Sequence, residues 1–191
     1  GCFRYVTEPE LFRLDLDVIH AVRQRYPNVH LMIPFVRTKW ELEACLHQID
    51  EHPLGRDRKL QRWIMAEVPS VVHWLPQYAQ LGIHGVSIGS NDLTQYLLAV
   101  DRNNARVAGL YHSLHPAVIQ ALESVARSCR AEGKPVSICG ELAGDPEGAV
   151  LLLAMGYDVL SMNSTSLPRV KKALRSIHLS EAQELLAQVL L

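Results

Sequence analysis

Polar and reactive residues follow short apolar segments at two places in the sequence. Asn91 and Asp92 come just after the apolar run Gly85–Gly89, and Cys139 ends the run Pro135–Cys139. An amide and a carboxylate can hold an anion or a metal ion, and a thiol can give or take a proton. In α/β folds, active sites are built from such groups at the carboxyl ends of buried strands. The sequence therefore predicts an active site at these strand ends.

A second carboxylate ends another apolar segment, Trp63–Glu67. Glu67 and Asp92 would lie at neighbouring strand ends. Two carboxylates suit Mg2+, which takes one or two protein carboxylates and leaves positions for substrate oxygens. The alternative is that both carboxylates cap loops or pair with surface cations. The residue types alone leave both interpretations open.

Arg102 and Cys139 are two further candidates for chemistry. A guanidinium binds phosphate through paired donors, although an arginine that follows an aspartate, as Arg102 follows Asp101, more often forms a surface ion pair. Cys139 is a candidate for proton transfer, although most lone cysteines are inert apolar residues. A basic cluster on a predicted helix is expected to face water: Arg169, Lys171, Lys172 and Arg175.

Five short apolar segments predict the strands that position these groups. They are Val29–Phe35, Trp63–Glu67, Gly85–Gly89, Pro135–Cys139 and Val159–Met162. They show no clean alternation of apolar and polar residues, which is expected for strands buried on both faces of a parallel sheet. Helical patterns alternate with them, and this alternation predicts βα units.

Several local signals predict where the helices begin and end. The segment Thr38–Glu41 is a capping box, and Gly156 is placed to end another helix. Ser180–Gln183 predicts the cap of a final amphipathic helix. A further helix is expected over Pro9–Tyr26, with an apolar stripe of Leu11, Leu14, Val18, Ile19 and Val22.

The predicted fold class is α/β, of the TIM (β/α)8-barrel type, truncated to roughly the last five βα units. A complete barrel needs eight strands and about 250 residues, whereas this chain has 191 residues. The helix before the first strand would belong to an earlier unit whose strand is missing. We expect residues 1–191 to form one domain, the C-terminal part of a barrel in a longer polypeptide.

The composition narrows the possible partners and location. The chain is 48% hydrophobic and 20% charged with a formal net charge of −1, so it gives no bulk reason to bind nucleic acid or an anionic membrane. No apolar run approaches the roughly 20 residues of a membrane span, and the first residues do not resemble a signal peptide. The four cysteines lack the spacing of a zinc site or a disulfide framework. We therefore expect a reduced, cytoplasmic protein.

Several segments, in the same order along nearly the whole chain, resemble the C-terminal barrel of the PEP-utilising enzymes. This family includes phosphoenolpyruvate synthase, pyruvate phosphate dikinase and Enzyme I of the phosphotransferase systems. The segments are Met32–Thr38, Glu67–Pro69, Ser87–Gln95, Asp101–Arg102 and Ile138–Glu141. The resemblance implies a domain that binds phosphoenolpyruvate (PEP) and pyruvate.

The resemblance also implies roles for individual residues. Glu67 and Asp92 match the family's magnesium ligands, and Asp92 is also expected on the substrate side. Asn91 and Arg102 match residues that hold the phosphate of PEP, and Cys139 matches the cysteine that protonates the enolate. The implied reaction is Mg2+-dependent phosphoryl transfer between PEP and a phosphohistidine domain, through the enolate of pyruvate.

Two subtypes of the family remain open. Gly1–Tyr5 and Met32–Thr38 look more like phosphoenolpyruvate synthase, whereas Asp92–Arg102 and Gly140–Pro146 look more like Enzyme I, a PEP-protein phosphotransferase of a sugar or nitrogen system. The substrate-side motifs favour the synthase type slightly. Because the phosphohistidine domain is missing from this sequence, the chain alone is expected not to complete turnover.

Two other functions compete with this one. The chain could be a non-catalytic oligomerisation module, because barrels of this family dimerise and an open sheet has edges that favour pairing. The retained site residues argue against that alternative, although a homodimer is expected in either case. The chain could also be another magnesium-dependent enolate enzyme, such as a lyase or an aldolase. Asn91 and Arg102 together favour a substrate that carries phosphate.

Overall fold

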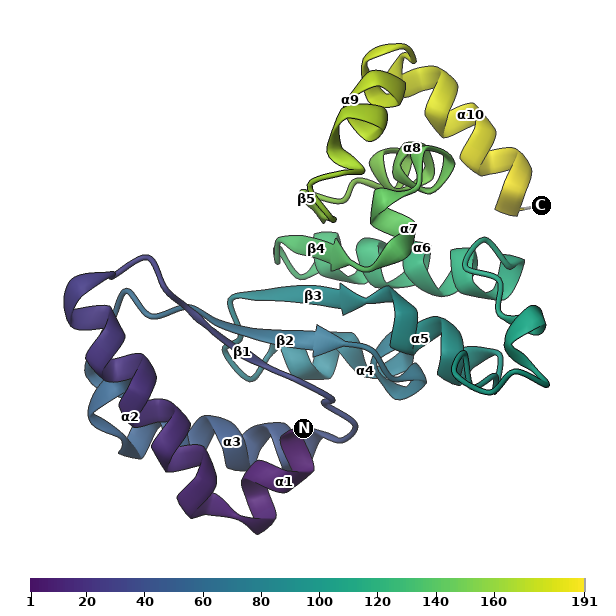
Figure 1. The fold of residues 1–191 in the computed structure, drawn as a ribbon. Coiled ribbons are helices and arrows are strands. Elements are labelled where there is room, and N and C mark those ends of the chain that lie inside the picture. Colours follow the sequence, from purple (N-terminus) through teal and green to yellow (C-terminus); the bar gives the residue numbers. More distant parts are fainter. Residues whose placement is uncertain (191) are drawn as a thin grey trace.

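A five-stranded parallel sheet is the centre of the fold, as a computed structural model describes it for residues 1–190. The strands lie side by side in chain order: β1 (Leu31–Ile33), β2 (Arg62–Ala66), β3 (Gly85–Gly89), β4 (Val136–Cys139) and β5 (Val159–Ser161). Each strand pairs in parallel with the next. The carboxyl ends of all strands therefore lie at one edge of the sheet (Figure 1). The predicted α/β class is confirmed.

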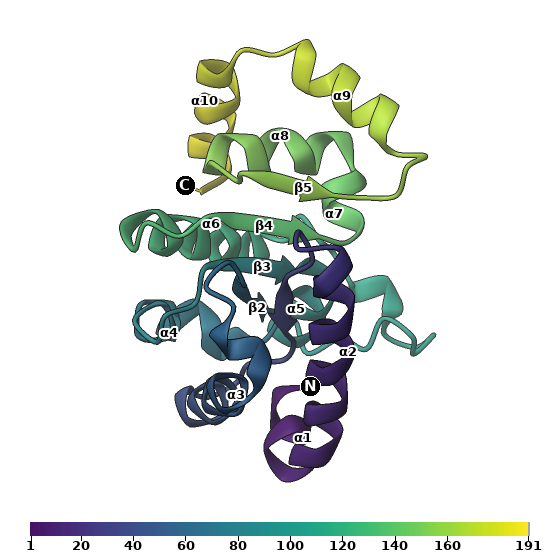
Figure 2. The same ribbon diagram turned by 90° about the vertical axis from the view of Figure 1, so that its left-hand side faces the viewer.

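Helices connect consecutive strands and cover the sheet. In chain order they are α1 (Cys2–Thr7), α2 (Pro9–Arg25), α3 (Lys39–Glu51), α4 (Pro69–Ala79), α5 (Ser90–Leu97), α6 (Pro116–Ala131), α7 (Glu141–Gly144), α8 (Pro146–Met155), α9 (Leu167–Arg175) and α10 (Leu179–Leu190). Two short 3-10 turns are η1 (Pro53–Arg56) and η2 (Ala108–Leu110). Helices α3, α4, α6 and α8 are neighbours in that order along one side of the strands (Figure 2). This arrangement is that of one sector of a barrel.

The observed strands agree best with the prediction at the centre of the sheet. β3 has the predicted bounds, and all five of its residues are buried. β1 is shorter than the predicted Val29–Phe35, because Pro34 has no N–H to donate and Phe35 turns into the left-handed region at φ 51°. β5 was expected to be buried, but Val159 is 53% exposed. That expectation was wrong because β5 is an edge strand with one neighbour.

Helix signals were confirmed at two helix ends and wrong at a third. The Thr38 hydroxyl and the Glu41 carboxylate exchange the two hydrogen bonds of a capping box at α3. Gly156 ends α8 in the left-handed conformation at φ 86°. The final helix, however, begins at Leu179, so Ser180–Gln183 does not cap it. The Glu181 carboxylate instead accepts a hydrogen bond of 2.8 Å from the His178 amide.

Helix α2 packs through a face that differs from its predicted apolar stripe. Phe12 and Leu16 are buried, whereas Leu14 and Val18 are each 62% exposed. The Phe12 ring stacks on Tyr5 of α1 with 4.2 Å between centroids. Helix α1 was not expected from the sequence, and together with α3 and η1 it covers the buried face of α2.

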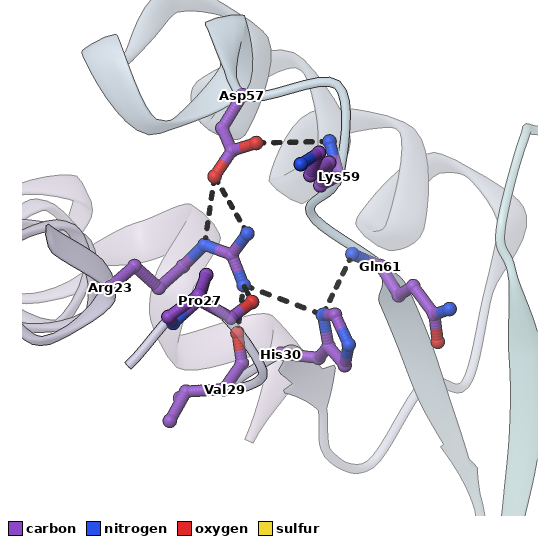
Figure 3. Close-up of polar contacts among 7 residues, drawn as sticks. All are labelled: Arg23, Pro27, Val29, His30, Asp57, Lys59 and Gln61. Carbon is purple, nitrogen blue, oxygen red and sulfur yellow. Dashed lines mark hydrogen bonds and ion pairs between the residues drawn. The ribbon is translucent and has the colours of Figure 1, made fainter. Parts of the chain in front are cut away.

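The loops at the amino ends of the strands are held by a buried arginine (Figure 3). The side chain of Arg23 in α2 is 2% exposed. It donates to Asp57 Oδ2 through Nε at 3.1 Å and through Nη2 at 2.6 Å, and Nη1 donates to the carbonyls of Pro27 and Val29. We call these four residues the Arg23 cluster. It ties the end of α2 to the loops that precede β1 and β2.

The fold has one continuous apolar core, to which α1 to α8 and α10 contribute residues. That residues 1–191 form the C-terminal part of a larger barrel domain stays a prediction. Within residues 1–190, no helix combines the length and the apolar composition needed to cross a bilayer.

Candidate functional site

Four of the five predicted site residues gather at the carboxyl ends of three neighbouring strands. Glu67 follows β2, Asn91 and Asp92 lie in the first turn of α5 directly after β3, and Cys139 ends β4. The register of β3 and β4 pairs the last residues of the two strands with each other. Arg102 joins them from the loop after α5, where its Nη2 lies 3.8 Å from Asp92 Oδ1. The parallel topology thus brings four of the residues together, and the ion pair with Asp92 places Arg102 beside them.

Glu67 is a buried carboxylate, and both of its oxygens are closely surrounded by neighbouring residues. It is 4% exposed, and its Oε1 accepts a hydrogen bond of 2.7 Å from the amide of Phe35, whose backbone is in the left-handed region. A Cβ atom at Gly89 would lie 2.6 Å from Glu67 Oε2, so only glycine leaves room for this oxygen. Burial raises the pKa of Glu67, the Phe35 hydrogen bond opposes that rise, and the Asp92 charge adds to it.

The donor set at this place fits Mg2+. No group of three or more His, Cys, Asp or Glu side chains that could enclose a metal ion occurs within residues 1–190. Glu67 and Asp92 are two carboxylates close enough to interact electrostatically, and Glu67 has no salt-bridge partner among the residues that the structure describes. Mg2+ commonly binds through two carboxylates, with water and substrate phosphate completing its octahedron.

The Cys139 thiol is expected to be protonated at neutral pH. Burial raises the pKa of the Cys139 thiol, and the negative charges of Glu67 and Asp92 raise it further. Its Sγ lies 3.5 Å from the Ile88 carbonyl oxygen in β3, to which the thiol donates. The site therefore presents a protonated thiol next to two carboxylates, which suits a proton donor.

Asn91 is held by the turn between β4 and α7. The backbone amide of Glu141 donates to Asn91 Oδ1 at 3.2 Å. This approach requires glycine at position 140, where φ is +116° and a Cβ atom would lie 2.9 Å from Asn91 Oδ1. The Ser90 hydroxyl donates to the Cys139 carbonyl at 2.7 Å and fastens the same turn. The ends of β3 and β4 are thus locked together.

An open cavity of about 910 Å3 lies at the ends of β3, β4 and β5. Asn91 and Cys139 line it, whereas Glu67, Asp92 and Arg102 are not part of its lining. Its other lining residues are Tyr111, His112, Ser113, Leu114, Gly140, Glu141, Gly144, Asp145, Pro146, Ser161, Met162, Asn163, Ser166 and Arg169. This volume lies within the usual range of small-molecule sites.

Sequence reasoning missed several residues of this site. Arg169 is exposed, as expected for this basic cluster, but it also borders the cavity from the first turn of α9, which the sequence did not indicate. Its position after the last strand was a usable signal, because loops at that end of a barrel often bind anions. Tyr111 lies in the irregular connection between α5 and α6, where no periodic pattern marks it.

Comparison with known proteins gives one family and a fold. Residues 1–179 match the family described as PEP-utilising enzyme, PEP-binding domain. The chain is 40% identical over 185 residues to the phosphoenolpyruvate-dependent phosphotransferase system protein of Escherichia coli K12, covering 93% of this chain and 25% of that protein. It is also 40% identical over 185 residues to phosphoenolpyruvate synthase of Aeropyrum pernix, covering 93% of this chain and 22% of that protein. The chain thus spans about a quarter of the length of these curated relatives.

Two solved structures share the fold at low sequence identity. A citrate lyase from Burkholderia xenovorans has a TM-score of 0.57 at 20% identity, over 75% of this chain and 48% of that chain. An HpcH/HpaI aldolase from Desulfitobacterium hafniense has a TM-score of 0.52 at 16% identity, over 76% and 62% of the two chains. Both have TIM-barrel-like folds, which confirms the predicted barrel type. At this identity the likeness concerns the fold alone.

Proposed function

This chain belongs to the PEP-utilising enzymes, and we propose that it forms the PEP- and pyruvate-binding catalytic part of a phosphotransferase of that family. The observation that carries the proposal is the convergence of Glu67, Asn91, Asp92 and Cys139 on adjacent strand ends, with Arg102 beside them. Transfer of the phosphoryl group to a phosphohistidine domain, a homodimer and a cytoplasmic location are further parts of the proposal.

The residues divide the work by their chemistry. Asn91 and Arg102 offer N–H donors to the phosphate of PEP, and the guanidinium also neutralises charge on it. Glu67 and Asp92 would hold Mg2+ on the same side, with Asp92 also facing the substrate. When bound, Mg2+ supplies positive charge to the phosphoryl and enolate oxygens. Arg102 is already held beside Asp92 by its ion pair.

Cys139 would supply the proton that turns the enolate into pyruvate. Its raised pKa keeps the thiol protonated at neutral pH, so that it is ready to donate to the enolate carbon. In the reverse direction the thiolate would accept a proton from the methyl group of pyruvate. Burial and the surrounding carboxylates disfavour the thiolate, so the thiol is the predominant form at neutral pH.

Cys139→Ala is expected to slow the exchange of pyruvate methyl protons with solvent at least about 100-fold, because the acid–base group is lost. Proton NMR in D2O with Mg2+ measures this exchange. Calorimetry should show unchanged pyruvate affinity, since the thiol is not expected to hold the ligand. Exchange at the wild-type rate would remove Cys139 from the mechanism.

The subtype stays a proposal. We favour a synthase-like enzyme on the substrate-side motifs, with Enzyme I as the alternative. The chain is 40% identical to a relative of each kind, so identity does not separate them. The competing oligomerisation module predicts a folded chain that assembles but binds no PEP.

A calorimetric titration of PEP, with and without Mg2+, tests the proposed function directly. We expect saturable binding that requires Mg2+. Oxalate, which mimics the enolate but carries no phosphate, should also bind with Mg2+ and more weakly than PEP. A chain that is folded by circular dichroism and binds neither compound would contradict the proposal. Equal affinity for both compounds would instead favour an enolate enzyme whose substrate has no phosphate.

A further inference from the structure

Tyr111 lies beside Asn91 in the cavity, and no role follows for it from the family resemblance. Its hydroxyl oxygen is 3.5 Å from the main-chain carbonyl oxygen of Asn91 and 3.5 Å from Asn91 Oδ1. Both distances are long for an O–H···O hydrogen bond, which is usually 2.5–3.0 Å. The hydroxyl therefore has only weak acceptors within residues 1–190 and can donate to a better one in the cavity.

The side-chain amide of Asn91 has a fixed orientation. Because the backbone N–H of Glu141 is a donor, the Asn91 atom that faces it at 3.2 Å must be the oxygen, Oδ1. The NH2 group of Asn91 then points away from Glu141, and it makes no hydrogen bond to any residue that the structure describes. Asn91 thus presents donors rather than an acceptor, which suits an anion and not a metal ion.

Thr94 provides an independent observation behind Tyr111. It is fully buried in α5, and its hydroxyl has no hydrogen-bond partner among residues 1–190. It nevertheless lies close enough to Tyr111 to lower the pKa of that phenol, as the Arg102 guanidinium also does, while burial raises this pKa most strongly and the Glu141 charge adds to the rise. A buried hydroxyl without a partner is rare and requires an explanation. The Tyr111 oxygen keeps acceptor capacity while its O–H donates, so the Thr94 hydroxyl can donate to it once ligand binding brings the two oxygens within hydrogen-bond distance.

We propose that Tyr111 is a ligand-binding residue that donates its hydroxyl proton to the phosphate of PEP, next to the Asn91 amide and with Thr94 donating to the Tyr111 oxygen from behind. The proposal rests on the proposed function and adds a residue that selects for phosphate. The net raised pKa of Tyr111 keeps the phenol a donor throughout the neutral range. The arrangement also satisfies the Thr94 hydroxyl, which nothing else in the described chain does.

A purely structural role for Tyr111 makes a different prediction. If the ring only packs the connection between α5 and α6, removing its hydroxyl changes the affinities for PEP and for oxalate equally or not at all. If the hydroxyl binds phosphate, its loss affects PEP and spares oxalate. The comparison of these two ligands therefore separates the two roles.

The experiment is a set of calorimetric titrations of PEP and of oxalate, both with Mg2+. Tyr111→Phe is expected to weaken PEP binding about 10- to 100-fold, because a hydrogen bond to a charged group is lost. Oxalate affinity should stay within about twofold. Tyr96→Phe, which changes an exposed tyrosine on the neighbouring α5, is the matched control and should bind both ligands as the wild type does.

Variants of Thr94 test the second half of the proposal. Thr94→Val should weaken PEP binding by less than Tyr111→Phe, and it should have no further effect in the double variant, because Thr94 acts through the Tyr111 oxygen. Thr94→Ser keeps the hydroxyl and should bind PEP normally. Unchanged PEP affinity in Tyr111→Phe, or equal losses for PEP and oxalate, would overturn this inference alone. A wild-type chain that binds neither ligand would overturn it together with the proposed function.

Discussion

Glu67→Gln is expected to weaken PEP binding at least about 100-fold and to remove its dependence on Mg2+, because a metal ion contributes several kcal/mol of charge stabilisation. The variant removes one of two carboxylates and leaves the shape of the side chain. Its amide oxygen can still accept the hydrogen bond that Glu67 Oε1 receives from Phe35. The loop after β1 should therefore keep its conformation. Calorimetric titration of PEP with and without Mg2+ measures the effect.

Glu141→Gln is the matched control for this prediction. Glu141 is an exposed carboxylate at the cavity, so the variant removes the same charge without touching the predicted magnesium ligands. PEP affinity should stay the same or increase slightly, because less negative charge opposes the anion. If both variants lost affinity equally, the effect of Glu67 would be a general change of potential, and its assignment as a metal ligand would be wrong.

The raised pKa of Glu67 also predicts that Glu67→Gln changes the stability of the fold. Burial is the main cause of the rise above the ordinary value of 4.5, and Asp92 adds to it. The stability that this group contributes is fully present below its unfolded pKa and is lost as the pH rises through its folded pKa. Without Mg2+, Glu67→Gln should therefore unfold at a higher temperature than the wild type at pH 7. Added Mg2+ should stabilise the wild type and leave the variant unchanged.

Local signals explain why part of the fold could be predicted from the sequence. The strand Gly85–Gly89 is a short, mostly apolar run between glycines with no charged residue, and its burial at the centre of the sheet needs no further information. The capping box at Thr38 depends on residues three positions apart. Likewise, the placement of Asn91 and Cys139 at one edge follows from parallel pairing alone. Features of this kind can be predicted because they depend only on nearby residues or on the order of the strands along the chain.

Contacts between distant segments explain what the sequence could not show. The Phe35 amide meets Glu67 across 32 positions, and only the left-handed backbone of Phe35 aims it there. Tyr111 reaches Asn91 from a connection without periodicity. The buried face of α2 packs against α3, η1 and the unexpected helix α1, where Tyr5 stacks on Phe12. In each case the position of a residue depends on a contact with another segment of the chain, which the local sequence does not identify.

Arg23→Ala is expected to cause the largest loss of stability, about 3 kcal/mol in the free energy of unfolding. The buried guanidinium holds Asp57 and two backbone carbonyls, and its removal leaves those carbonyls unpaired around a void (Figure 3). Urea unfolding measures the loss, which corresponds to a fall of about 6–12 °C in Tm for a chain of this size. Arg23→Lys should recover little, because one ammonium group cannot reproduce the planar fork.

Arg25→Ala is the matched control, because Arg25 lies in the same turn, is exposed and only stacks over the Tyr26 ring. Its effect should stay within about 0.5 kcal/mol. A loss in Arg23→Ala no larger than that would contradict the prediction.

Asp57→Asn separates the ion pair from the carbonyl contacts of the Arg23 cluster. The Asp57 side chain is 36% exposed, so this variant should cost clearly less than Arg23→Ala. The hydrogen bond from Arg23 is the main cause of the lowered pKa of Asp57. The contribution of this carboxylate is therefore present above its ordinary pKa of 3.8 and is lost as the pH falls through the lowered value. The difference between wild type and Asp57→Asn should accordingly narrow in acid.

Because of the position of the Arg23 cluster, Arg23→Ala also tests whether stability and ligand binding depend on opposite ends of the strands. The cluster joins loops at the amino ends of β1 and β2, whereas the site residues follow the carboxyl ends of β2, β3 and β4. In barrels the first end carries stability and the second carries function. Arg23→Ala should therefore bind PEP with wild-type affinity at temperatures where it remains folded. A loss of affinity in the folded variant would mean that the two ends are coupled through the short β1 and β2 strands.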